Sequence, residues 1–77
     1  MKTNKIYNRL NRDVHKLMQT SLLKKGRRVV LRMGYDEETG VIIESYSRRT
    51  ATCKVLRDDG ICVAARRVDI IWALEMV

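Results

Sequence analysis

Hydrophobic and polar positions follow two different periods along the chain, and the period changes at Gly26. Before this glycine, apolar residues recur every three or four positions, which places them on one face of an α-helix. The stripe consists of Ile6, Leu10, Val14, Leu17 or Met18, and Ser21 or Leu22. Lys24 and Lys25 would oppose the helix dipole in the last turn, and Gly26 would end the helix in the left-handed conformation. The pattern predicts one amphipathic helix over residues 3–25.

From Arg27 onward, apolar and polar residues alternate, which is the two-residue period of a β-strand. The predicted strands cover residues 27–33, 41–46, 51–57 and 61–65; residues 68–72 form a last strand or a single turn, and residues 73–77 extend it or curl away. Residues 34–40 are predicted as a turn or loop, and Asp58-Asp59-Gly60 as a hairpin turn. Five short strands at this spacing favour a small antiparallel barrel over an open sheet, whose edges would be unprotected. The helix would cover one face or one open end of the barrel.

Four stretches of the chain resemble the KOW and Tudor-like small barrels, which have the SH3-like fold. They are Leu23-Lys-Lys-Gly-Arg-Arg-Val-Val-Leu31, Gly40-Val-Ile42, Asp58-Asp-Gly60 and Arg67-Val-Asp-Ile70. In that order they are similar to the family's opening strand, second strand, closing hairpin and last turn. The resemblance covers about residues 23–72 and implies a mainly β fold, a five-stranded antiparallel SH3-like barrel over residues 27–72. Together with the periodicity of residues 3–25, this predicts a barrel preceded by one N-terminal α-helix. Proteins of this group bind nucleic acids or protein tails and are rarely enzymes, so the fold alone does not select the function.

Length and charge narrow the class of protein. The 77 residues suffice for a single domain, residues 1–77, with one small core. Lys and Arg number 16 against 9 Asp and Glu, and the resulting formal charge of +7 favours a polyanionic partner. No apolar run reaches the length of a membrane span, and no signal-peptide segment follows the basic N-terminus. We therefore expect a cytoplasmic protein that binds no membrane.

Residues that could carry covalent or metal chemistry are few. Cys53 and Cys62 form no Cys-x-x-Cys pair, and in a reducing compartment we expect two free thiols. A hairpin at residues 58–60 would pair Val55 with Val63 or a neighbour, so the two cysteines would not face each other. The single histidine lies within the predicted helix and has no nucleophile or acid at a recognisable spacing. We expect no enzyme activity, no cofactor and no metal site.

Arginine pairs at two chain reversals, together with arginines of the first strand, form the candidate binding site. In a small barrel such reversals can gather at one rim, close to the outward face of the first strand. The candidate residues are Arg27, Arg28, Arg32, Arg48, Arg49, Arg66 and Arg67. Guanidinium groups bind phosphates bidentately, so this set favours a phosphate backbone as the ligand.

The few aromatic residues decide how such a ligand would be bound. Tyr35, Tyr46 and Trp72 are the only rings in the strand region, too few for a row of base-stacking contacts, and they are the candidates for an aromatic cage, which so few rings disfavour. We therefore expect a small basic nucleic-acid-binding protein that contacts the phosphate backbone, with double-stranded DNA favoured over RNA. The alternative is a regulatory interaction module that docks on an acidic surface of a larger complex.

Overall fold

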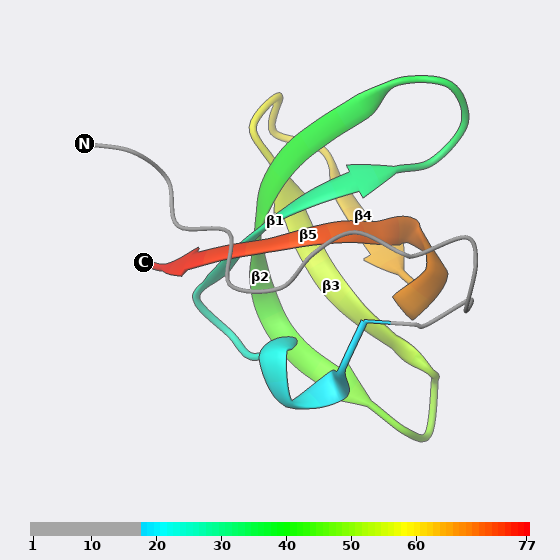
Figure 1. The fold of residues 1–77 in the computed structure, drawn as a ribbon, viewed down its shortest axis with the longest axis vertical. Coiled ribbons are helices and arrows are strands. Elements are labelled where there is room, and N and C mark those ends of the chain that lie inside the picture. Colours follow the sequence, from blue (N-terminus) through cyan, green and yellow to red (C-terminus); the bar gives the residue numbers. More distant parts are fainter. Residues whose placement is uncertain (1–17) are drawn as a thin grey trace.

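A computed structural model describes residues 18–77, which form one five-stranded antiparallel sheet (Figure 1). The elements are the 3-10 turn η1 (Thr20–Leu22), β1 (Arg27–Arg32), β2 (Glu37–Ser47), β3 (Thr52–Arg57), β4 (Cys62–Ala65), the 3-10 turn η2 (Arg67–Asp69) and β5 (Ile70–Met76). The strand order is β4-β3-β2-β1-β5, so β5 returns to the outer side of β1. The predicted mainly β fold with five antiparallel strands is confirmed. The strand order is that of an open sheet, with β4 and β5 at its two edges.

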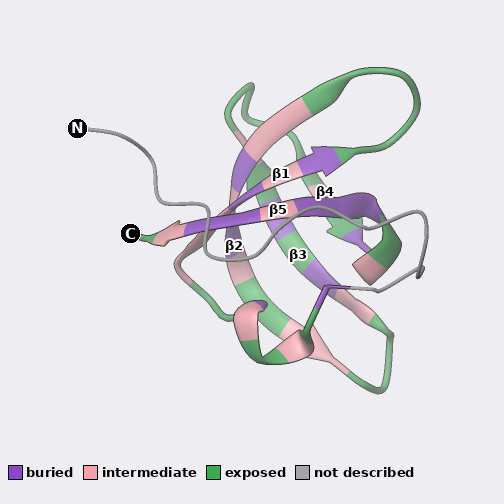
Figure 2. Cartoon of the chain, in the orientation of Figure 1, coloured by how far each residue is buried: buried purple, intermediate pink, exposed green. Residues whose placement is uncertain are grey.

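The sheet curls because its long strands are irregular. β2 has 11 residues, and its pairing with β3 shifts register between Ile42 and Glu44 and again between Glu44 and Ser47. Such bulges bend a strand and increase its twist, and Figure 1 shows β2 curving through the whole height of the molecule. The curled sheet encloses one core, visible in Figure 2 as buried stretches of neighbouring strands. The core side chains are Met18, Leu23, Val29, Leu31, Ile42, Cys53, Val55, Ala65, Ile70 and Ala73.

The helix predicted for residues 3–25 is wrong where the structure describes it, because residues 18–25 contain only the single turn η1. Residues 3–17 lie outside the described residues. Met18 and Leu23 are both buried although they are five positions apart, a spacing that puts two side chains on different faces of an α-helix. Leu23 instead runs beside β2, where its carbonyl accepts a hydrogen bond from the Tyr46 N–H at 2.9 Å. Long-range pairing with the sheet therefore replaces the helix here.

Gly26 adopts the predicted left-handed backbone, with φ of +98°, but for a different reason. The Arg27 N–H donates to the Lys24 carbonyl at 3.0 Å, which closes a tight turn with Gly26 at its third position. The Gly26 N–H donates to the Ile42 carbonyl of β2 at 2.8 Å, and its own carbonyl accepts from the Val77 N–H at 2.7 Å. Gly26 therefore leads into β1 between β2 and the end of β5, and it does not cap a helix as predicted.

The loop predicted for residues 34–40 is shorter in the structure, because its last residues, including Gly40, belong to β2. β2 already begins at Glu37, and Gly40 lies inside the ladder opposite Arg57 of β3. A Cβ at residue 40 would lie 2.6 Å from Val55 Cγ1 and 2.7 Å from the Leu56 carbonyl oxygen. Glycine is needed here for close strand packing, which sequence alone does not distinguish from a loop. At the other end of the chain, residues 67–76 contain both predicted alternatives, a turn followed by a strand.

Candidate functional site

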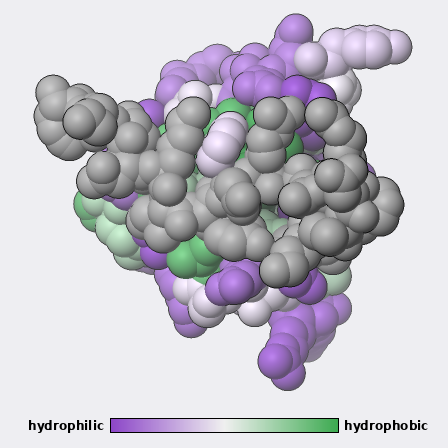
Figure 3. Space-filling view, in the orientation of Figure 1, coloured by the Kyte–Doolittle hydropathy of each residue, from purple (hydrophilic) through white to green (hydrophobic). Residues whose placement is uncertain are grey.

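Most acidic residues gather at one end of the described structure and most basic residues at another, although Arg32 and Arg57 lie among the acidic group and Asp69 beside the basic one. One group lies around the β1–β2 loop and the β3–β4 turn and is called the acidic end: Asp36, Glu37, Glu38, Asp58 and Asp59. The other lies around the β2–β3 turn and is called the basic end: Lys24, Lys25, Arg48, Arg49, Arg66 and Arg67. Figure 3 shows hydrophilic side chains along both the upper and the lower edge of this face. The separation follows from the antiparallel ladder, because successive reversals of β2, β3 and β4 alternate between the two ends.

The β2–β3 turn holds Arg48 and Arg49 at the tip of the basic end. Ser47 fixes its backbone, since its side-chain oxygen accepts from the Arg49 N–H at 3.2 Å and its carbonyl accepts from the Ala51 N–H at 2.7 Å. Both arginines are exposed. Within residues 18–77 neither guanidinium forms a hydrogen bond or an ion pair. Two unpaired positive charges on an ordered turn are therefore available to a ligand.

Lys24 and Lys25 extend this surface, which the sequence reasoning missed. Both side chains are exposed. The Lys25 N–H donates to Ser45 Oγ at 2.8 Å, so the lysines lie beside the last part of β2, a few residues before Arg48. The sequence shows only a pair of lysines before a glycine. The two lysines lie near the β2–β3 turn because of the hydrogen bond between Lys25 and Ser45, which are twenty residues apart in the chain.

The corner Arg66-Arg67 lies at the same end of β3, because Ala65 pairs with Cys53 near the start of that strand. Arg66 is largely exposed, and its Nε and Nη2 donate to the Asp69 carboxylate, each at 3.2 Å. This contact raises the pKa of the Arg66 guanidinium. The Arg67 Nε donates to the Met18 carbonyl at 2.8 Å, which anchors the segment before η1. Arg66 and Arg67 thus add positive charge while each already has a structural contact.

The remaining three candidate arginines have partners elsewhere. Arg27 donates from Nε to the Leu22 carbonyl and from Nη1 to the Leu74 carbonyl, both at 3.0 Å, so it ties η1 and β5 to the start of β1. Arg28 pairs with Glu75 at 3.4 Å. Arg32 pairs with Glu37 at 2.7 Å, at the acidic end. The structure therefore brings the two arginine pairs to one end of β3 and leaves Arg32 at the opposite end of β2.

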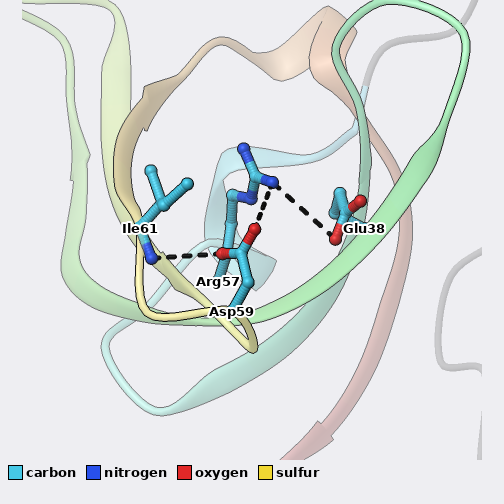
Figure 4. Close-up of polar contacts among 4 residues, drawn as sticks. All are labelled: Glu38, Arg57, Asp59 and Ile61. Carbon is cyan, nitrogen blue, oxygen red and sulfur yellow. Dashed lines mark hydrogen bonds and ion pairs between the residues drawn. The ribbon is translucent and has the colours of Figure 1, made fainter.

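At the acidic end, Arg57 lies between Glu38 and Asp59 (Figure 4). Its Nη2 is 3.9 Å from Glu38 Oε1 and also bonds Asp59. Asp59 in turn accepts from the Ile61 N–H at 3.1 Å, which fixes the β3–β4 turn. Beside this cluster is a hollow of about 190 Å³ lined by Leu31, Met33, Tyr35, Asp36, Glu38 and Arg57. The acidic end is therefore partly neutralised internally.

The two cysteines have different environments, and both are free thiols, as predicted. Cys53 is buried, and this burial raises the pKa of its thiol from 9.0 to about 11. Cys62 is exposed on β4. Residues 18–77 contain no group of three or more His, Cys, Asp or Glu side chains that could hold a metal ion. Neither short helical turn of that part of the chain could cross a bilayer.

Comparison of the chain with protein-family models, with curated proteins and with solved structures finds no match. The fold and the distribution of charge are therefore the observations that bear on function.

Proposed function

We propose that the protein binds nucleic acid through the basic end, by contacts with the phosphate backbone, and that it prefers double-stranded DNA. One observation carries the proposal: Arg48 and Arg49 are exposed on an ordered turn and have no partner within residues 18–77. Lys24 and Lys25 lie nearby. Free guanidinium groups favour phosphate oxygens, and the formal charge of +7 adds a long-range attraction.

The preference for a duplex rests on the aromatic residues within residues 18–77, none of which is exposed at the basic end. Single-stranded binding usually needs aromatic side chains on which successive bases stack. The fully exposed Tyr35 belongs to the β1–β2 loop, and Tyr46 packs against the core. Backbone contacts without stacking suit a duplex, whose bases are already paired, and they carry little sequence information.

The fold supports the same proposal. Strand order β4-β3-β2-β1-β5, with a 3-10 turn before the last strand, fits the segments that resemble the KOW and Tudor-like barrels. We propose that the curled sheet is an SH3-like barrel in this sense, although its ladder is open between β4 and β5. The acidic end would repel phosphates and so direct the opposite end toward the duplex.

The test is duplex binding measured by fluorescence anisotropy at several salt concentrations. Four to six phosphate contacts predict a slope of log affinity against log salt of about −4 to −5. The double variant Arg48→Glu with Arg49→Glu is expected to weaken binding to all sequences alike and to flatten the slope by about 2. Its control is Arg28→Glu with Arg32→Glu, which changes the net charge equally but at arginines that already pair with Glu75 and Glu37.

Two outcomes would contradict the proposal. The first is an equal loss of affinity in both double variants, which would mean that net charge acts without a defined site. The second is an absence of duplex and single-strand binding by the wild type at about 50 mM salt, where such electrostatic binding is strong. An absence of binding would favour the alternative function, a regulatory module that docks on an acidic surface of a larger complex. A pull-down that retains a protein partner after nuclease treatment and loses it in the Arg48→Glu, Arg49→Glu variant would support that alternative.

A further inference from the structure

β4 is an edge strand whose outer hydrogen-bonding groups have no partner within residues 18–77. It pairs with β3 in unbroken register, with Val55 opposite Val63. The Arg57 N–H donates to the Ile61 carbonyl at 2.8 Å, so this pair is a hydrogen-bonded one. Because hydrogen-bonded and non-bonded pairs alternate in an antiparallel ladder, Val63 also bonds to β3. Cys62 and Ala64 then direct their N–H and C=O groups away from the sheet, and both residues are exposed.

Within residues 18–77, this edge lacks the features that usually prevent pairing with another chain. Edge strands are commonly protected by charged side chains, proline or bulges. Residues 61–65, Ile-Cys-Val-Ala-Ala, contain no charge and no proline, and the pairing with β3 has no register shift. The small side chains of Cys62 and Ala64 would also let a second strand approach closely. An extended strand can therefore add to the sheet at this position.

We propose that β4 binds β4 of a second copy of this chain, in antiparallel orientation about a two-fold axis at Val63. In this register Cys62 of each copy lies opposite Ala64 of the other, and all their outward groups form hydrogen bonds. A register centred on Cys62 would need the Gly60 N–H, which already donates to the Arg57 carbonyl at 2.8 Å. One centred on Ala64 would need the Arg66 N–H, which donates to Asp69 at 2.9 Å.

Charge supports the second copy as the occupant. The acidic turn Asp58-Asp59 precedes β4, and the basic corner Arg66-Arg67 follows it. Antiparallel pairing about Val63 brings each corner close to the acidic turn of the other copy, twice in the dimer. A parallel arrangement would instead set like charges side by side. Asp59 is held in place at the start of β4 by its bond to the Ile61 N–H (Figure 4), and the Arg66 side chain is 68% exposed. This contact uses Arg66 and Arg67 of the basic end but leaves Arg48 and Arg49 outside it, so it does not rest on the proposed function.

The first test measures oligomeric state by sedimentation equilibrium. Because a four-residue strand makes a small contact, the dimer should be weak and is best sought up to about 1 mM protein. Ala64→Pro removes only an outward N–H and Ala64→Lys adds a charge at the edge, so each should yield a monomer with a near-normal melting temperature. Met33→Lys, on the exposed β1–β2 loop, is the control and should still dimerise. A monomeric wild type at the highest concentration, or dimers of both Ala64 variants, would overturn the proposal.

The second test fixes the register by disulfide formation. In Ala64→Cys, the introduced cysteine would face Cys62 of the second copy, with Cα atoms about 5.5 Å apart, within the range of a disulfide. Mild oxidation should give a covalent dimer on a non-reducing gel. The wild type should not, since its two Cys62 residues would be diagonal neighbours about 7–8 Å apart. Equal cross-linking of the wild type, or none in the variant, would contradict the register at Val63.

Discussion

Replacing Gly40 by alanine tests the close packing of β2 on β3. The added Cβ would lie 2.6 Å from Val55 Cγ1 and 2.7 Å from the Leu56 carbonyl oxygen. Such contacts are too short for any side chain, so one of the two strands must move. The side chain of Val55 is fully buried and the second atom belongs to the backbone, which leaves little freedom for relaxation.

The expected cost follows from these two contacts. Adding a group to a packed core usually destabilises by about 1–3 kcal/mol. Since one of the clashing atoms is backbone, we expect the upper part of that range, about 2–3 kcal/mol. In a domain of this size that corresponds to a fall in melting temperature of about 10–20 °C. Thermal and urea unfolding followed by circular dichroism would measure it.

A double-mutant cycle separates the clash from other effects of the substitution. Val55→Ala removes the Cγ1 atom, so it should cost less in the Gly40→Ala background than in the wild type, by about 1 kcal/mol. Gly34→Ala is the matched control, because nothing lies within 4 Å of a Cβ there and only the left-handed backbone, φ +107°, resists it. A Gly40→Ala variant that unfolds at the wild-type temperature, or simple additivity of the changes at residues 40 and 55, would refute a clash between Gly40 and Val55.

Three other predictions concern Gly26 and the cysteines. Gly26→Val should destabilise by about 1–2 kcal/mol, because a β-branched residue resists a φ of +98°; an unchanged urea midpoint would contradict this. In the folded protein an alkylating reagent should modify the exposed Cys62 quickly and the buried Cys53 only after denaturation, which mass spectrometry can follow. Burial raises the pKa of the Cys53 thiol from 9.0 to about 11. Between these two pH values the thiol stays protonated in the folded protein and loses its proton in the unfolded chain. Stability should therefore be full below about pH 9 and fall by about 2–3 kcal/mol toward pH 11, and Cys53→Ala should lack that part of the slope.

Features that depend on neighbouring residues could be predicted from the sequence. Alternation identified the buried pairs Val29 and Leu31 of β1 and Cys53 and Val55 of β3. The turn chemistry of residues 58–60 predicted the β3–β4 hairpin and placed Val55 opposite Val63 or a neighbour, and the structure has Val55 opposite Val63. These predictions hold because a two-residue period and a tight turn are local properties of the chain.

The candidate site was predictable only in part. The β2–β3 turn with Arg48 and Arg49 followed from local signals, and so did the corner at residues 66–67. The hydrogen bonds from Arg27 to the Leu22 and Leu74 carbonyls could not be predicted in this way. These two acceptors are main-chain atoms that lie far from each other in the sequence. An arginine that binds backbone has the same sequence signature as one that is free for a ligand.

Tertiary structure decided the features in which local and long-range preferences disagree. Residues 18–25 have a helical apolar spacing, yet the bond between the Leu23 carbonyl and Tyr46, twenty-three positions later, draws the segment against β2. Glycine is typical of loops, yet Gly40 belongs to β2 because β3 packs closely against it. In both cases the free energy comes from contacts between residues distant in sequence, which outweigh a weak local propensity. Local pattern therefore determined the strands and turns, and the packing of those strands determined what lies beside them.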